Sequence, residues 1–138
     1  MSMVLELMRG SLRDFVTNPA RALSSADGFL LLDHLIDAVA AVHAEGIWHR
    51  DIKIDNVGYI VTPHGYQFKL MDFGQAVAAD KQDYAACGTP GYRPLEQAGG
   101  KPYGAKVIVY AVFLTVMCAC DVGTDMLFSD EQIGRAHV

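Results

Sequence analysis

The sequence predicts an α+β fold that is mainly helical. Apolar residues recur every three or four positions between 29 and 46, two β-rich runs flank a turn between 57 and 73, and the segment 107–120 is apolar almost throughout. The chain has 138 residues, of which 51% are hydrophobic. That is enough for one modest domain with a core of its own.

The first third of the chain is predicted to hold a strand and two helices. The apolar run "MVLEL", 3–7, is expected to be a buried strand, and 10–16 a turn that opens a short helix. Apolar side chains share one helical face in 29–46, so this segment is predicted to be a long helix. Asp27 is its expected N-cap, and Gly46 is expected at its C-terminus because glycine readily adopts the left-handed conformation.

The remaining chain is predicted to hold a hairpin, an irregular segment and a second helix. The runs 57–62 and 66–73 are separated by "PHG", a turn signal. Gly and Pro are frequent between 74 and 104, where no period is visible, and such segments are often functional. The run 107–120 is expected to be a fully buried helix, because it is shorter than the roughly 18 residues that span a bilayer.

Composition argues against several classes of protein. The formal net charge is -5 and the 11 Lys and Arg residues are scattered, so a nucleic-acid partner is not expected. The three cysteines, Cys87, Cys118 and Cys120, form neither a disulfide framework nor a zinc-ligand pattern. Since no secretory signal or membrane span is expected either, the sequence predicts a cytoplasmic protein without a membrane partner.

The stretch "HRDIKIDN", 49–56, crowds six charged or polar side chains into eight positions. Charge runs are usually solvated surface, but this one lies between the long helix and the hairpin. Asp51 and Asn56 are five residues apart, and Asp72 follows the second run of the hairpin. The oxygen atoms of Asn56 and Asp72 could bind Mg²⁺, which prefers oxygen ligands. The Asp51 carboxylate could accept a proton from a hydroxyl nucleophile or orient it. Lys53 could neutralise the charge of a transferred phosphoryl group. The pattern therefore indicates phosphoryl transfer, which needs positioning and electrostatics.

Four segments resemble the eukaryotic protein kinase family, of the Ser/Thr type. "HRDIKIDN" resembles its catalytic loop, "DFG", 72–74, its metal-binding turn, and "GTPGYRPLE", 88–96, the end of its activation segment. "MVLELMRGSLRDF", 3–15, resembles the strand, hinge and helix that join the two lobes. All four occur in the family's order and at its spacing, so the resemblance implies the helical large, C-terminal lobe of a kinase-like fold.

The resemblance also implies a role for each matching residue. Asp51 is implied as the catalytic base, and Lys53 as the contact to the γ-phosphate of ATP. Asn56 and Asp72 are the implied ligands of Mg²⁺. Thr89 is implied to bond both Asp51 and Lys53.

The hinge residues are implied to bind the adenine of ATP. Glu6 and Met8 would offer main-chain groups to it, and Leu5 would be the gatekeeper. Gly58 stands where the family has an apolar floor residue, which weakens this pocket. Ile108 departs from the family too, because an Asp at that place normally accepts hydrogen bonds from the catalytic loop.

Both ends of the kinase pattern are missing from the chain. A glycine-rich loop and the lysine that binds phosphates do not precede the hinge, so we expect a domain truncated at both ends. The tail "QIGRAHV", 132–138, back-translates to a common sequencing-adapter sequence. We therefore expect the partial kinase domain to span 1–131 and the tail 132–138 to be non-native.

The activation segment lacks the usual acceptor of a regulatory phosphate. Between Gly74 and Gly88 the only hydroxyl belongs to Tyr84, and Ala85 occupies the usual threonine place. Arg50 would then have no phosphothreonine to pair with. We expect activity, where present, not to require phosphorylation there, with Asp80 or Asp83 as an electrostatic substitute.

The resemblance implies a fragment of a protein serine/threonine kinase whose parent transfers the γ-phosphoryl group of ATP to protein substrates. The alternative is a catalytically inactive, pseudokinase-like binding module. A small-molecule phosphotransferase is a weaker third possibility, because such enzymes usually lack the "DFG" and "GTPGY" pair.

The histidines and the tryptophan have structural interpretations. His34 is expected to face solvent, and His43 to pack near the end of the long helix. His49 is expected, from the resemblance, to pack beside Phe73. Trp48 is expected to anchor the catalytic loop to the core.

Overall fold

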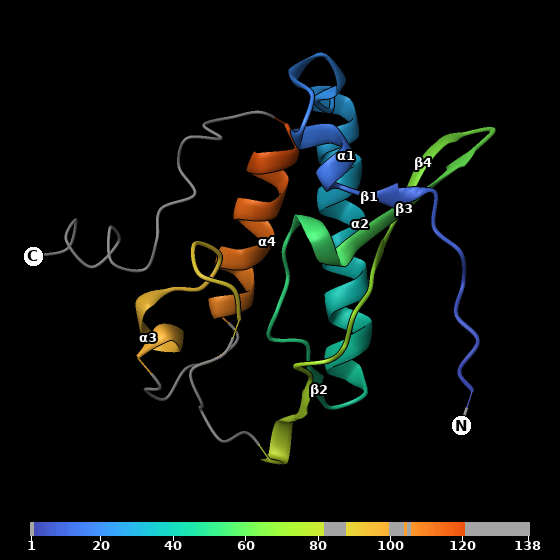
Figure 1. Ribbon diagram of the computed structural model, residues 1–138. Coiled ribbons are helices and arrows are strands. Elements are labelled where there is room, and N and C mark those ends of the chain that lie inside the picture. The colour runs from blue at the N-terminus through green and yellow to red at the C-terminus, as the bar shows by residue number, and fades with distance from the viewer. Residues whose placement is uncertain (1, 82–87, 100–103, 105, 121–138) are drawn as a thin grey trace, which may run out of the picture.

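The computed structural model describes residues 2–81, 88–99, 104 and 106–120. Two long helices, α2 (Ser25–Ala44) and α4 (Lys106–Ala119), lie side by side, and a β-hairpin packs against α2 (Figure 1). Fully buried side chains fill the space between α1 (Arg13–Val16), α2, the loop 49–56 and the hairpin. Leu12, Leu31, Leu35, Ile54 and Val57 are the largest apolar ones.

The long helix α2 begins earlier than its apolar pattern alone predicts. The hydroxyl of Ser24 accepts a hydrogen bond from the backbone N–H of Asp27 at 3.2 Å, which makes Ser24 the N-cap. The expectation that Asp27 caps the helix is therefore wrong, since Asp27 lies in its first turn. Gly46 has φ +70°, the left-handed conformation expected after a helix end.

The hairpin has the predicted place in the chain. β3 (Val57–Thr62) and β4 (Gly65–Leu70) are antiparallel, with Val57 opposite Leu70 and Thr62 opposite Gly65. A short strand, β1 (Gly10–Ser11), adds to the other edge of β3, so the sheet order is β1-β3-β4. Because paired strand ends lie together, the residues just before β3 and just after β4 meet at one end of the sheet.

His34 joins α2 to the hairpin, so the expectation that it faces solvent is wrong. Its Nδ1 accepts a hydrogen bond from the backbone N–H of Phe68 at 3.1 Å, and the two rings lie 5.9 Å apart. Nothing in the helical spacing distinguishes a histidine that faces water from one that faces a sheet edge. The other expectation holds, because the rings of His43 and Trp48 lie 6.1 Å apart near the end of α2.

The predicted buried strand at 3–7 is wrong. Residues 2–8 adopt no regular structure, and the side chains of Val4 and Leu5 are 95% and 72% exposed. Pairing begins only at Arg9, whose backbone N–H donates to the carbonyl of Tyr59 at 2.8 Å. An apolar run forms a strand only where another strand offers hydrogen bonds, and the described residues place none beside 3–7.

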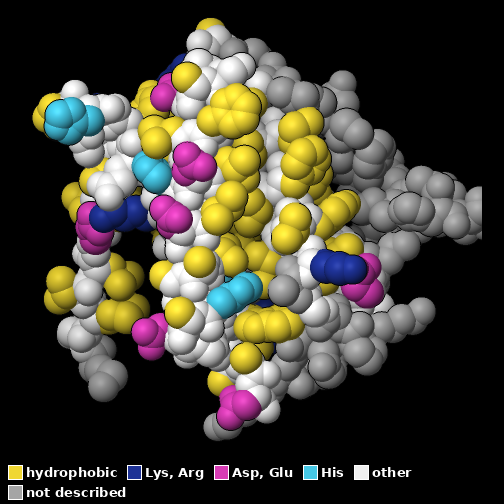
Figure 2. All heavy atoms as spheres, turned by 180° about the vertical axis from the view of Figure 1, so that it is seen from behind, with side chains coloured by type: hydrophobic (Ala, Val, Ile, Leu, Met, Phe, Trp, Pro, Cys, Tyr) yellow, Lys and Arg dark blue, Asp and Glu magenta, His cyan; other side chains and the backbone are white. Residues whose placement is uncertain are grey.

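The helix α4 is buried on one face only. Ile108 and Thr115 face the core, whereas Val109 and Phe113 are 69% and 58% exposed. The expectation of a fully buried helix is therefore wrong. Figure 2 views the molecule from behind relative to Figure 1 and shows hydrophobic side chains gathered in a band over the middle of that face. Within the described residues, the structure contains no helix of the length and apolar character needed to cross a membrane.

Short elements hold the segments around the loop 49–56. β2 (Ile47–Trp48) pairs with β5 (Val77–Ala78), which ties the start of the loop to the segment after Gly74. A 3-10 helix, η2 (Ile54–Asn56), closes the loop. The described part of 74–104 is mostly irregular, as predicted, and holds β5, η3 (Ala79–Lys81) and α3 (Leu95–Ala98). One further 3-10 helix, η1 (Pro19–Arg21), precedes α2.

Candidate active site

The loop 49–56 is anchored to the core and is not a solvated charge run. Four of its side chains are buried and the other four are only partly buried. The buried ones are His49, Ile52, Ile54 and Asn56. The apolar and amide side chains therefore hold the loop in place, and the charged ones are displayed along its other side.

His49 fastens the start of the loop to the segment after β4. Its Nδ1 accepts from the backbone N–H of Asp51 at 3.1 Å, and its Nε2 donates to the carbonyl of Met71 at 2.9 Å. These partners assign the proton to Nε2. The ring also packs edge-on against Phe73, with 4.9 Å between centroids. The expectation that His49 packs beside Phe73 is confirmed.

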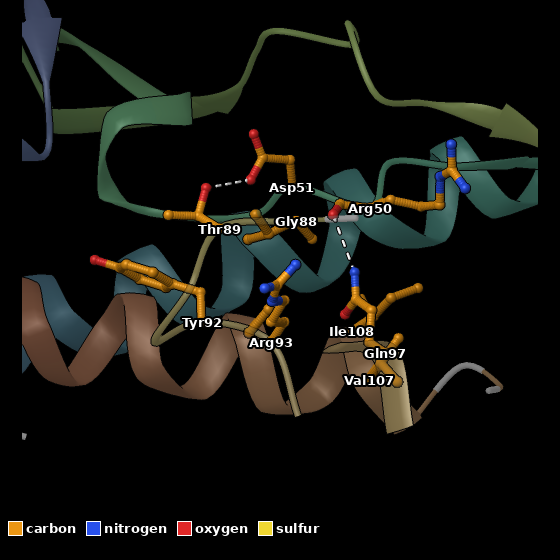
Figure 3. A pocket seen from close by; sticks show the side chains of 11 residues that line it. Arg50, Asp51, Gly88, Thr89, Tyr92, Arg93, Gln97, Val107 and Ile108 are labelled. Atoms are coloured by element: carbon orange, nitrogen blue, oxygen red, sulfur yellow. Dashed lines mark hydrogen bonds between the residues drawn. The ribbon is translucent and has the colours of Figure 1, made fainter. Parts of the chain in front are cut away.

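The Asp51 carboxylate is held by three side chains. Thr89 Oγ1 donates to Asp51 Oδ1 at 2.8 Å, and the two side chains point toward one another (Figure 3). Asn56 Nδ2 donates to Oδ2 at 3.1 Å, and Lys53 Nζ lies 3.9 Å from the same oxygen. The side chain of Asp51 is 11% exposed, so few rotamers are open to it. This arrangement orients a carboxylate for work on a hydroxyl group.

Asn56 supports the loop and keeps one oxygen available. Its Nδ2 also donates to the main-chain oxygen of Asp51 at 2.8 Å. The main-chain oxygen of Asn56 accepts a hydrogen bond from the backbone N–H of Met71 at 2.9 Å. This bond brings the residues that flank the hairpin together. Asn56 is 5% exposed, and no described residue donates a hydrogen bond to its Oδ1. A buried amide oxygen without a donor fits a hard cation.

Asp72 follows the hairpin at the end where Asn56 precedes it. Its backbone is left-handed, with φ +58°, and its Oδ1 accepts from the backbone N–H of Gly74 at 3.1 Å. This side chain is exposed. A strained left-handed conformation in a residue other than glycine is common where function requires it. Asn56 and Asp72 thus offer oxygen atoms from neighbouring segments.

Gln75 is a site residue that sequence reasoning missed. Its Oε1 accepts from the backbone N–H of Gly88 at 2.8 Å, and its Nε2 lies 3.5 Å from Asp51 Oδ2. The guanidinium of Arg50 donates to the main-chain oxygen of Gln75 at 2.7 Å. The one signal in the sequence is an amide side chain directly after "DFG", and its partners lie far away in the chain.

Gln97 is a second residue that sequence reasoning missed. It is buried, and its Nε2 donates to the main-chain oxygen of Arg50 at 3.3 Å (Figure 3). Gly88 lies against it in a left-handed conformation, with φ +82°, and a Cβ there would be 2.9 Å from Gln97 Nε2. Only glycine fits both the conformation and the space.

A small pocket lies under the loop, between Arg50, Thr89 and Ile108. Ile108 is buried and offers no acceptor to the loop. The backbone N–H of Asp51 is nevertheless paired, because His49 Nδ1 accepts it. His49 thus supplies an acceptor to the loop that Ile108 cannot offer.

The helix α1 fixes the end of the loop by an ion pair. The Arg13 guanidinium bonds both carboxylate oxygens of Asp55, one of them at 2.8 Å. This hydrogen bonding holds the pKa of Asp55 below its usual range, against the opposing effect of its partial burial. Because Asp55 lies within η2, the pair positions the turn that presents Asn56.

The two predicted hinge residues contact the hairpin. Glu6 pairs with Lys69 Nζ at 2.6 and 2.7 Å, and Met8 packs against Gly58. A Cβ on Gly58 would lie 2.6 Å from Met8 Cγ and 3.1 Å from Met71 Sδ. The two methionines therefore fill the space that the glycine leaves. In the described contacts, neither Glu6 nor Met8 meets the Asp51 group.

A family model and several relatives of known type all compare this chain with protein kinases. A family described as "Protein kinase domain" matches residues 1–136. The chain is 38% identical over 114 residues to the serine/threonine-protein kinases GD17699 of Drosophila simulans and CG17528 of Drosophila melanogaster. It is 35% identical over 121 residues to the mouse serine/threonine-protein kinase DCLK2.

These alignments cover most of this chain and little of the relatives. They include 80% of the chain for the Drosophila proteins and 86% for the mouse protein. The chain spans about 15% of the length of the former and 16% of the latter. The family match runs into 132–138, a segment outside the described residues. The chain belongs to the protein kinase domain family.

Proposed function

We propose that the protein containing this chain transfers the γ-phosphoryl group of ATP to serine or threonine hydroxyls of protein substrates. The observation that carries the proposal is the Asp51 carboxylate, oriented by Thr89 and Asn56 with Lys53 beside it. Transfer of a phosphoryl group needs a positioned hydroxyl and a way to stabilise negative charge. Asp51 and Lys53 supply these two functions from one short loop.

Asp51 acts on the acceptor hydroxyl. With Oδ1 engaged by Thr89 and Oδ2 by Asn56 and approached by Gln75, the carboxylate keeps lone pairs for a further donor, the hydroxyl of the substrate. A positioned general base typically contributes about 10²- to 10⁴-fold to a rate. Lys53, held near the same carboxylate, neutralises charge on the transferred group.

Asn56 and Asp72 are the proposed ligands of Mg²⁺. The buried Asn56 Oδ1, to which no described residue donates, and the carboxylate of Asp72 are both hard oxygen ligands. When bound there, Mg²⁺ would supply positive charge that offsets the negative charge of the phosphate groups.

We also propose that residues 1–131 form part of the large, C-terminal lobe of the kinase domain, with 132–138 as a non-native tail. The helices α2 and α4 and the loop between α2 and the hairpin support this placement. Glu6 and Met8 are the proposed hinge contacts to adenine through their main-chain groups. Phosphorylation-independent activity also stays a prediction, because Tyr84 and Asp83 lie outside the described residues.

A cytoplasmic location is proposed from the use of cysteine. Cys118 and Cys120 carry free thiols in the described structure, and burial raises the pKa of both. Thiols of this kind suit a reducing compartment. The proposed partners are protein substrates.

The experiment is phosphotransfer from Mg-ATP to protein and peptide acceptors by the full-length protein that contains this chain. We expect Asp51→Asn to reduce kcat by at least 100-fold, because the amide cannot act as a base. Asp37→Asn makes the same chemical change on the exposed side of α2 and should leave kcat unchanged. Activity toward a metabolite alone would point to a small-molecule phosphotransferase.

A second candidate is a pseudokinase-like binding module without catalysis. The observation that favours it is Ile108, which gives the loop no acceptor from α4. Binding of ATP without turnover, unaffected by Asp51→Asn, would support the module. Turnover that depends on Asp51 would exclude it.

A further inference from the structure

Gln75 connects three segments that the chain keeps far apart. It directly follows Gly74, and its side chain reaches both Gly88 near the end of the activation segment and Asp51 in the catalytic loop. Its main-chain oxygen accepts from Arg50 at 2.7 Å. One residue therefore contacts the catalytic loop twice and the activation segment once.

The orientation of the Gln75 amide follows from its partners. The backbone N–H of Gly88 needs an acceptor and takes Oε1 at 2.8 Å, which turns Nε2 toward the Asp51 carboxylate, 3.5 Å away. A glutamate could accept from Gly88 but would place a second negative charge beside Asp51. A leucine could neither accept the hydrogen bond from Gly88 nor donate one toward Asp51.

These contacts form a closed cycle that runs from Gln75 through Gly88 and Thr89 to Asp51 and back to Gln75. Gln75 holds Gly88, and the next residue, Thr89, donates to Asp51 Oδ1 at 2.8 Å. Gln75 Nε2 approaches the other oxygen, Oδ2. The side chain of Gln97 also lies against Gly88, so two glutamines contact the backbone there.

We propose that Gln75 is a positioning residue for phosphoryl transfer. It acts through Gly88 on Thr89, and directly on Asp51, to set the direction of the carboxylate. The Gln75 amide and the bond from Arg50 to its carbonyl hold the end of the activation segment without an added phosphate group. This inference rests on the proposed function.

The test compares two substitutions at Gln75 with the same two at Gln67 in the full-length protein. Gln67 lies exposed on β4, outside the Asp51 group, and its variants control for the change of charge and of polarity. We expect Gln75→Leu to lower kcat about 5- to 20-fold, the loss of one or two hydrogen bonds. The KM for ATP should change by less than about twofold, because the amide contacts no predicted nucleotide ligand.

Gln75→Glu separates the two contacts of the side chain. Its carboxylate still accepts from Gly88 but places a second negative charge beside Asp51, so kcat should fall at least as much as in Gln75→Leu. A residue that only holds the fold through its bond to Gly88 would be replaced by glutamate without loss of kcat. Gln67→Glu should leave kcat unchanged.

Hydrogen exchange at the Gly88 amide gives a readout that does not need catalysis. Gln75→Leu should speed that exchange about tenfold, whereas Gln75→Glu should retain protection, because its carboxylate still accepts. An active protein whose kcat and Gly88 exchange are unchanged by both Gln75 variants overturns the inference and leaves the proposed function intact. A wild-type protein that transfers no phosphate overturns both.

Discussion

At the scale of single residues, hydrogen bonds fix the orientation of the Asp51 carboxylate. An exposed aspartate samples several rotamers, but this one has each oxygen engaged by a side chain from a different part of the chain. Thr89 comes from the activation segment and Asn56 from η2. The direction of the Asp51 carboxylate therefore depends on both segments being in place.

The Thr89 hydroxyl provides a direct test of this dependence. Thr89→Ala removes the donor to Asp51 Oδ1, and hydrogen bonds to charged groups contribute about 1.5–3 kcal/mol. We expect kcat to fall about 10- to 100-fold in steady-state phosphotransfer by the full-length protein. Thr89→Ser keeps the hydroxyl and should retain most of the rate. Equal losses in both variants would contradict a role for the hydrogen bond.

At the scale of elements, short segments place the site more than the long helices do. The four-residue helix α1 bonds η2 through Arg13 and the hairpin through Asp14, whose carboxylate accepts from the Tyr59 hydroxyl at 3.0 Å. The two-residue strands β2 and β5 tie the loop to the segment after Gly74. Such elements are too short to be stable alone, so packing determines them.

The ion pair between α1 and η2 predicts a dependence on pH. Asp55 has a lowered pKa when folded, so its contribution is complete above the unfolded value of about 3.9 and is lost as the pH falls through the folded value. Both partners are more than a third exposed, so screening limits the contribution to about 0.2–1 kcal/mol.

Chemical unfolding measured between pH 2.5 and 7 checks this prediction. Asp55→Asn should lower the free energy of unfolding at pH 7, and its difference from the wild type should shrink as the pH falls below about 3.9. Asp33→Asn, an exposed change on α2, is the matched control and should follow the wild type throughout. A constant offset between Asp55→Asn and wild type at every pH would contradict the assignment.

At the scale of the whole molecule, one face carries a continuous apolar surface. Side chains of α2 and α4 line two grooves there (Figure 2). Phe29, Ile36, Val109 and Phe113 are exposed on it. Exposed apolar patches of this kind promote association unless another surface covers them.

The 138-residue chain by itself is therefore expected to self-associate. Phe113 contributes to both grooves, so Phe113→Glu should reduce the fraction of oligomer seen by sedimentation velocity at about 50 μM. Gln67→Glu adds the same charge on the hairpin and should not reduce it. A wild-type chain that sediments as a monomer would contradict the expectation.

Local patterns in the amino-acid chain were sufficient to place both long helices, the hairpin and the polar loop between them. Helical periodicity and turn chemistry act over a few residues, so they are visible without the fold. The clustering of Asp51, Asn56 and Lys53 could be inferred because eight residues hold all three. Asp72 could be inferred from its place directly after the second run of the hairpin, and the family's motifs added Thr89.

Only the folded chain placed the residues whose partners are distant in sequence. Gln75 meets Gly88, Gln97 meets Arg50, and His34 meets a strand more than thirty residues away. The apolar run 3–7 and the outer face of α4 were misjudged for the same reason. Burial depends on which surfaces pack together in the fold. The hydrophobicity of a residue indicates only that its burial would be favourable, and not whether the fold buries it.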